Sequence, residues 1–212
     1  RTGVMTFSLG LTILGVILLV INFLFGRFAS GWYFLYPIIF YPQWEAWATD
    51  VFLVALALLG VAWLVWSMAY LWSVIERYGV SKALGWHYLK GEVKEEVPPI
   101  IIISTVATIA GTVSLISGVL LLAHFLYHRF SGNPVDALLM KNLLFLFGHT
   151  LINIVMYHCI AMFYEVYPEY TKNPWKTAKP VVYAWNSSWI ILLFAMGHHL
   201  YMDFAQLKTL SY

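Results

Sequence analysis

Five apolar runs, each long enough to cross a bilayer, limit the folds open to this chain. Their approximate bounds are residues 5–25, 51–75, 100–125, 137–165 and 181–205. A helix needs about 20 apolar residues to span the hydrocarbon core. In lipid only helices and closed barrels satisfy every backbone polar group, and these runs do not alternate as barrel strands do. The sequence therefore predicts an all-α integral membrane protein, with five transmembrane helices in a single membrane domain over residues 1–212.

Composition and charge support this prediction and exclude several kinds of partner. Hydrophobic residues make up 61% of the 212 and charged residues 10%, whereas soluble domains carry about 25% charged residues. A net charge of +2 without a basic tract gives no indication of nucleic-acid binding. Cys159 is the single cysteine, so an intrachain disulfide and a multi-cysteine metal site are excluded. Because the sequence begins with Arg1 and not with methionine, and no signal-peptide pattern follows, we expect this chain to be a segment of a longer protein.

The links between the runs carry the helix breakers and most of the charges. An aromatic and proline-rich loop at residues 36–47 is suited to the membrane interface. The longest polar link covers residues 76–99, and shorter ones cover residues 128–136 and 168–180. Eight basic residues fall on one side: Arg1, Arg77, Lys82, Lys90, Lys94, Lys172, Lys176 and Lys179. Four fall on the other: Arg27, Arg129, Lys141 and Lys208. The positive-inside rule places the eight, and the start of the chain, in the cytoplasm.

Three histidines lie within the fourth and fifth runs at similar depths. His149 is on the order of 18 Å below the outer end of its helix, and His198 and His199 on the order of 10 Å below theirs. The two helices are antiparallel neighbours joined by a short link. All three imidazoles therefore lie in the outer half of the membrane, where they form a suitable site for copper, zinc or iron. The alternatives are hydrogen-bonded packing histidines or an interfacial pair near a helix end.

The segments around these histidines resemble a known family. "FGHTLINIVMY" (147–157) and "FAMGHHLYMDF" (194–204) are similar to the catalytic subunit I of the haem–copper oxidase superfamily, and "WYFLYPI" (32–38) resembles the loop after its third helix. The 49 residues between His149 and His198 match the B-type cytochrome oxidases. The resemblance implies that the five runs are helices three to seven of a bundle of about twelve. It covers nearly the whole chain.

The resemblance implies a set of cofactors and partners. His149, His198 and His199 would bind copper-B or a non-haem iron. A low-spin and a high-spin haem would take their axial ligands from outside this segment, so we assign none of His87, His124, His128 and His158 to haem. The expected partners are the lipid bilayer, the remaining helices of subunit I, an electron-donating subunit of the copper-A or cytochrome c type, and NO or O₂. The expected location is a prokaryotic plasma membrane, with this chain serving a respiratory electron transport chain.

Asn153 departs from the pattern of most oxygen reductases in this family, which have a cross-linked tyrosine four residues after the first copper ligand. That phenol supplies an electron and a proton when O₂ is split, and an asparagine amide cannot. Tyr157 and Tyr201 could replace it, although neither matches a known position. Reduction of NO to N₂O needs only two electrons. We therefore favour a nitric oxide reductase, with cytochrome c or quinol oxidation by O₂ as the alternative.

A stripe on the fourth helix indicates how protons would reach the site. Toward the cytoplasm, His149 is followed on one face by Asn153, Met156, Ile160 and Tyr164. Tyr164 and Thr177 match positions of the B-type proton channel, but Ile160 stands where that channel usually has a tyrosine. Glu165 is either a proton entrance or a solvated helix-end carboxylate. A broken path favours proton uptake from outside.

Two readings outside this class remain open from the sequence. The chain could belong to a non-redox transporter bundle, which would contain neither metal nor haem. It could also be a non-catalytic membrane anchor, in which case replacing His198 would leave activity unchanged.

Overall fold

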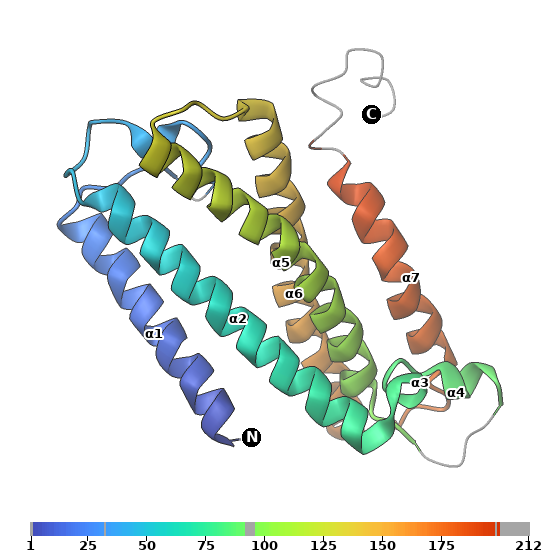
Figure 1. Ribbon diagram of the computed structural model, residues 1–212. Helices are drawn as coiled ribbons and strands as arrows, with labels where there is room; N and C mark the ends of the chain where they lie inside the picture. The colour runs from blue at the N-terminus through green and yellow to red at the C-terminus, as the bar shows by residue number, and fades with distance from the viewer. Residues whose placement is uncertain (1, 32, 92–95, 198, 200–212) are drawn as a thin grey trace, which may run out of the picture. The chain divides into compact units, whose positions relative to one another are not determined.

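The computed structural model describes residues 2–31, 33–91, 96–197 and 199, and these residues form helices and connecting loops without strands. The long helices are α1 (Thr2–Leu24), α2 (Ala48–Tyr78), α5 (Pro99–Ser131), α6 (Ala137–Thr171) and α7 (Lys179–Met196). Short helices are η1 (Ile38–Phe40), α3 (Val80–Ala83) and α4 (Trp86–Leu89) (Figure 1). Four helices, α1, α2, α5 and α6, are long and apolar enough to cross a membrane. The expectation of an all-α membrane protein is confirmed. Most of the fifth expected run lies in α7, and its end falls outside the described residues.

The chain divides into two compact units. The first contains Arg1–Ala69 and Ser114–Gly148, and the second contains Tyr70–Val113 and His149–Tyr212. Helices α2, α5 and α6 therefore contribute one part to each unit. His149 is the first residue of α6 that belongs to the second unit, so the candidate metal ligands are all in that unit.

In the first unit, small residues allow close helix packing. The Ser8 hydroxyl on α1 donates to the Ala62 carbonyl on α2 at 2.8 Å, and Ser117 on α5 donates to the Leu143 carbonyl on α6 at 2.9 Å. A Cβ at Gly118 would lie 3.0 Å from the Phe147 ring. Helices in lipid associate through such small-residue contacts and interhelical hydrogen bonds, since burial from water does not drive them together.

The aromatic loop between α1 and α2 folds over one end of the first unit. Phe28 stacks on Phe52 with 4.6 Å between ring centroids, in a core that also includes Ile39 and Phe125. The loop is also held by polar contacts with Tyr36, whose hydroxyl accepts from the Val135 amide at 3.3 Å. This arrangement explains why so many aromatic residues occur in a link between two apolar helices.

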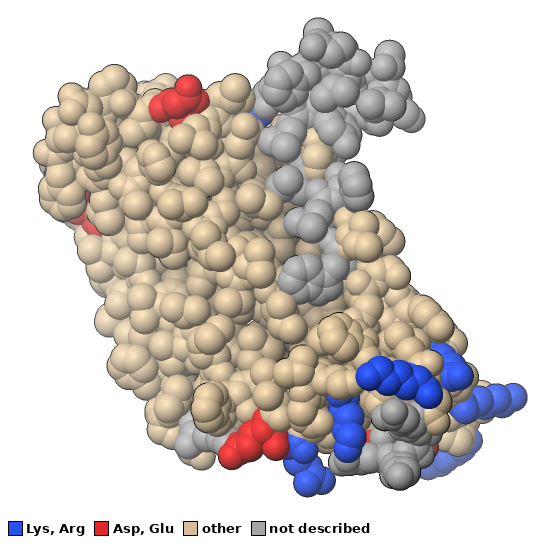
Figure 2. Space-filling model, turned by 45° about the vertical axis from the view of Figure 1, so that its right-hand side comes forward, with Lys and Arg blue, Asp and Glu red and all other residues tan. Residues whose placement is uncertain are grey.

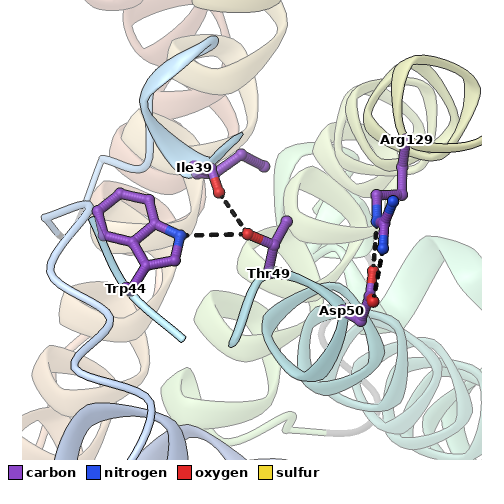
Figure 3. Close-up of polar contacts among 5 residues, drawn as sticks. All are labelled: Ile39, Trp44, Thr49, Asp50 and Arg129. Carbon is purple, nitrogen blue, oxygen red and sulfur yellow. Dashed lines mark hydrogen bonds and ion pairs between the residues drawn. The ribbon is translucent and has the colours of Figure 1, made fainter. Parts of the chain in front are cut away.

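Polar contacts of two residues, Thr49 and Asp50, hold the start of α2 (Figure 3). The buried Thr49 hydroxyl donates to the Ile39 carbonyl at 2.7 Å and accepts from the Trp44 indole at 3.2 Å. The Arg129 guanidinium on α5 donates twice to the Asp50 carboxylate, at 2.6 and 2.9 Å. A bidentate pair fixes the relative geometry of its two groups in addition to stabilising their contact. The loop, the start of α2 and the end of α5 are therefore held together.

In the second unit, part of the long polar link is helical. It forms α3 and α4, and α4 lies against α7. Asn186 on α7 donates from its side-chain amide to the Leu84 carbonyl at 3.0 Å and accepts from the Trp86 indole at 3.0 Å. The Tyr88 hydroxyl accepts from the Val97 amide at 2.9 Å. Lysine and arginine side chains gather at the end that carries α3 and α4 (Figure 2).

Helix α6 continues through Pro168, beyond the end expected from the sequence at residue 165. Proline has no amide hydrogen, so the carbonyl of Tyr164, four residues earlier, loses its helical partner. The Trp175 indole N–H donates to that carbonyl at 2.9 Å. The side chain from the following link thus satisfies the carbonyl freed by Pro168, and the helix ends only at Thr171.

Candidate metal centre

The structure brings two of the expected metal ligands together. His149 projects from α6 and His199 follows the end of α7, and both side chains are half-buried. The His149 Nδ1 and His199 Nε2 atoms are 3.1 Å apart, and the ring centroids are 5.1 Å apart. His198 lies outside the described residues. In the described part of the chain no group of three His, Cys, Asp or Glu side chains converges.

The spacing of the two nitrogens fits joint binding of one ion. Imidazole nitrogens lie about 2.0–2.1 Å from a bound zinc, and similar metals bind at similar distances, so two such ligands at ordinary angles stand about 2.9–3.4 Å apart. In the absence of metal, the same 3.1 Å approach is a hydrogen bond in which one ring nitrogen donates and the other accepts. A metal would take the place of that shared proton.

Asn153 lies one helical turn from His149, on the same face of α6. Its Nδ2 donates to the His149 backbone carbonyl at 2.9 Å, and the side chain is half-buried. The bond holds the amide against the helix, with Oδ1 as a potential acceptor. This side chain can form hydrogen bonds, but it has no oxidisable ring and no proton that titrates.

Of the two tyrosines considered as substitutes for a tyrosine at position 153, the structure describes one. Tyr157 packs its ring edge-to-face against Trp185, with 5.0 Å between centroids, and belongs to an apolar cluster with Ile103 and Val181. Tyr201 lies outside the described residues.

The residues of the predicted proton path separate into two groups. Tyr164 and Thr177 line one cavity of about 680 Å³, together with Ile160. The Thr177 hydroxyl also accepts from the Lys179 amide at 3.3 Å, at the start of α7. Glu165 does not line that cavity. Its exposed carboxylate accepts from the Ile100 amide at 3.2 Å, in the first turn of α5.

The contact made by Glu165 has a local physical cause. The first amides of a helix lack intrahelical acceptors, and negative charge is favourable there. Since α5 begins with Pro99, which has no amide hydrogen, the Ile100 amide is the first donor that needs a partner. A carboxylate from a neighbouring helix supplies it. The structure thus gives Glu165 a stabilising contact that sequence reasoning did not predict.

Two tryptophans of this region were also missed. Trp185 is buried between Tyr157 and Tyr164, and its indole N–H has no partner among the described residues. Trp175 stacks on Tyr164 at 5.2 Å and donates to its carbonyl. Pro168 is the signal that could have indicated Trp175, because a proline inside a helix requires a substitute donor for the carbonyl four residues before it.

Two of the other histidines, both left unassigned to haem, have local partners in the first unit. The His124 Nδ1 lies 2.7 Å from the Leu120 carbonyl, and the His128 Nδ1 lies 2.7 Å from the Asn133 carbonyl. Both are contacts within or just after α5. These bonds account for one ring nitrogen of each side chain.

Comparison with known proteins gives one family. The family model described as cytochrome c and quinol oxidase polypeptide I matches residues 2–211. No curated protein matches the chain, and no solved structure matches it.

Proposed function

Because the chain belongs to the cytochrome c and quinol oxidase polypeptide I family of respiratory oxidoreductases, we propose that it forms part of the catalytic subunit of a haem–copper-type reductase whose substrate is nitric oxide. The reaction is 2 NO + 2 e⁻ + 2 H⁺ → N₂O + H₂O. Family membership favours this redox role over a transporter bundle. The alternative within the family is reduction of O₂ to water.

His149 and His199, together with His198, are proposed to hold copper-B or a non-haem iron. The 3.1 Å approach of the His149 and His199 ring nitrogens supports this assignment. When bound, such an ion supplies a coordination position and electrons for the substrate. The haems that complete the site would take their axial ligands from residues outside this chain, and electrons would come from a copper-A or cytochrome c type subunit.

Asn153 is the observation that supports NO, and not O₂, as the proposed substrate. Its amide, bonded to the His149 carbonyl at 2.9 Å, occupies the place where the resemblance puts the oxidisable tyrosine. Splitting O₂ needs four electrons in quick succession, and an amide supplies none of them. Joining two NO molecules needs two electrons, which a bound metal ion and haem would supply without an oxidisable side chain. The remaining polar atoms of Asn153 can orient a ligand or water by hydrogen bonding.

Proton supply fits a reductase that takes protons from the outer side of the membrane. Tyr164 and Thr177 share a cavity near the inner ends of α6 and α7. Between Tyr164 and Asn153, the stripe on α6 offers Met156 and Ile160, which carry no exchangeable proton. Glu165 is engaged at the start of α5. We infer that this inner route does not deliver the two protons.

We also propose that the chain lies in a prokaryotic plasma membrane with its first residues in the cytoplasm.

Turnover of NO and O₂ by the purified full complex tests the proposal. The wild type should reduce NO faster than O₂. Asn153→Tyr should lower NO turnover by about tenfold or more, because its ring fills the space beside the metal and misplaces the substrate. Asn153→Asp keeps the size and an acceptor, so its loss should stay below about tenfold, the value of one hydrogen bond. Asn153→Tyr need not create an oxidase, since Ile160 still interrupts the inner route.

Rapid O₂ reduction with feeble NO turnover would overturn the proposal and favour the oxygen reductase. Tyr157→Phe and Tyr201→Phe would then show which phenol supplies the fourth electron. Unchanged activity after His198→Ala would instead indicate a membrane anchor without a catalytic role.

A further inference from the structure

The cavity between the end of α6 and the start of α7 has features that the proposed reaction does not use. Its volume of about 680 Å³ is within the range of about 300–1,000 Å³ typical of ligand sites. Most of its lining is apolar and aromatic, including Phe163, Tyr167 and Trp175. Its polar lining residues are Thr171 at the end of α6 and Asn173, Lys176 and Thr177 in the link that follows.

The apolar wall of this cavity is preformed by ring stacking. Phe163 stacks on Tyr167 at 5.2 Å with an interplanar angle of 13°, and Tyr164 stacks on Trp175 at 5.2 Å with an angle of 14°. The indole is held by its bond to the Tyr164 carbonyl, which Pro168 leaves without a helical donor. The wall therefore does not depend on a ligand to assemble it.

The rim of the cavity is basic and rich in hydrogen-bond donors. Lys176 is the only charged residue in its described lining, which also includes the side chains of Thr171, Asn173 and Thr177. These residues lie where α6 ends and α7 begins, at the level of lipid headgroups if both helices cross the membrane. Lys172 and Lys179 flank the rim along the chain. Lysine and arginine side chains gather at this end of the second unit (Figure 2).

We propose that this cavity binds one anionic phospholipid. The phosphate pairs with Lys176 and accepts from the Thr177 hydroxyl and the Asn173 side-chain amide, because the Thr171 hydroxyl already donates to the Tyr167 carbonyl. The first part of an acyl chain lies along the Phe163–Tyr167 wall. Basic pockets between membrane helices recognise lipid headgroups in this way. A free phosphate would use the rim and leave the apolar wall exposed to water, so the combination of charge and apolar length favours a lipid. The proposal is independent of whether the substrate is NO or O₂.

Lipid titration of the purified, delipidated complex tests this site. Native mass spectrometry would count the bound molecules of phosphatidylglycerol and of phosphatidylcholine with the same acyl chains. Lys176→Gln should weaken the tightest phosphatidylglycerol binding about fivefold, the contribution of one basic residue near a membrane surface. Phosphatidylcholine binding should be unchanged. The matched control is Lys90→Gln, which removes an exposed charge from the same unit outside the cavity.

A second variant tests the apolar wall. Tyr167→Ala removes a ring that is 60% exposed, so it should lower phosphatidylglycerol affinity while the melting temperature of the complex stays near that of the wild type. Inorganic phosphate and glycerol phosphate should fail to displace the lipid. Equal phosphatidylglycerol affinity in wild type and Lys176→Gln, an equal loss in Lys90→Gln, or displacement by inorganic phosphate would each overturn the proposal.

Discussion

At the scale of single residues, the chemistry of the second unit depends on where two imidazoles meet. His149 and His199 are 50 positions apart in the chain, yet their ring nitrogens are 3.1 Å apart. His149 belongs to α6 and His199 follows α7, and both helices are largely apolar, so an ionisable group without a partner would cost several kcal/mol there. Their mutual hydrogen bond lowers that cost without metal, and a bound metal would lower it further.

Metal content tests the assignment of His199 directly. His199→Gln should reduce the amount of the copper or non-haem iron in the purified complex by at least about tenfold, because one of three nitrogen ligands is lost and the remaining two hold the ion weakly. Elemental analysis measures this without reference to activity.

His124→Gln is the matched control for the metal measurement. His124 is a histidine of α5 whose Nδ1 contacts the Leu120 carbonyl in the first unit, so its replacement should leave the metal content unchanged. Equal metal content in wild type and His199→Gln would show that His199 is not a ligand.

At the scale of elements, the link between α2 and α5 depends on one glycine. Gly85 precedes α4 with φ 75° and ψ 7°, in the left-handed region. A Cβ at this position would lie 2.5 Å from Val182 on α7 and 3.1 Å from Ile102 on α5. The absence of a side chain therefore permits both the turn and the approach of α4 to α5 and α7.

Gly85→Ala should destabilise the second unit by about 2–4 kcal/mol in free energy of unfolding. About 1–2 kcal/mol comes from the left-handed backbone and the rest from overpacking against Val182. Gly91→Ala separates the two effects, since Gly91 also has a positive φ, 76°, but has nothing within 4 Å of the added Cβ. Denaturant-induced unfolding in detergent measures both. Equal losses in the two variants would contradict the packing explanation.

At the scale of the whole molecule, the distribution of charge predicts an orientation in the membrane. Of the eight basic residues assigned to the inner side, the described ones are Arg77, Lys82, Lys90, Lys172, Lys176 and Lys179, and all belong to the second unit. Translocating such a cluster is unfavourable, so the loops that carry it are expected to stay in the cytoplasm.

Site-directed labelling in intact cells tests this orientation. In a Cys159→Ser background, Pro134→Cys between α5 and α6 should react with a membrane-impermeant maleimide. Lys90→Cys should react only after the membrane is permeabilised, because the positive-inside rule predicts a cytoplasmic link. Both positions are exposed, so accessibility to the reagent depends on the side of the membrane. Labelling of Lys90→Cys in intact cells, with protection of Pro134→Cys, would reverse the assigned topology.

The sequence alone determined the fold class and the identity of the candidate site. Unalternating apolar runs of about 20 residues form helices in lipid, because a helix pairs the backbone N–H and C=O groups within its own segment. The same regular rise per residue converts sequence position into depth, which predicted that His149 and His199 lie at similar levels. The family resemblance rests on the same segments.

Only the tertiary structure decided which side chains satisfy the groups that helices leave unpaired. Glu165 bonds to the first free amide of α5, and the Trp175 indole bonds to the carbonyl freed by Pro168. The need for a partner is visible in each proline, Pro99 and Pro168. The sequence does not show which side chain is that partner, because many polar side chains could form the same hydrogen bond. The partner is decided by how neighbouring helices and links pack against one another.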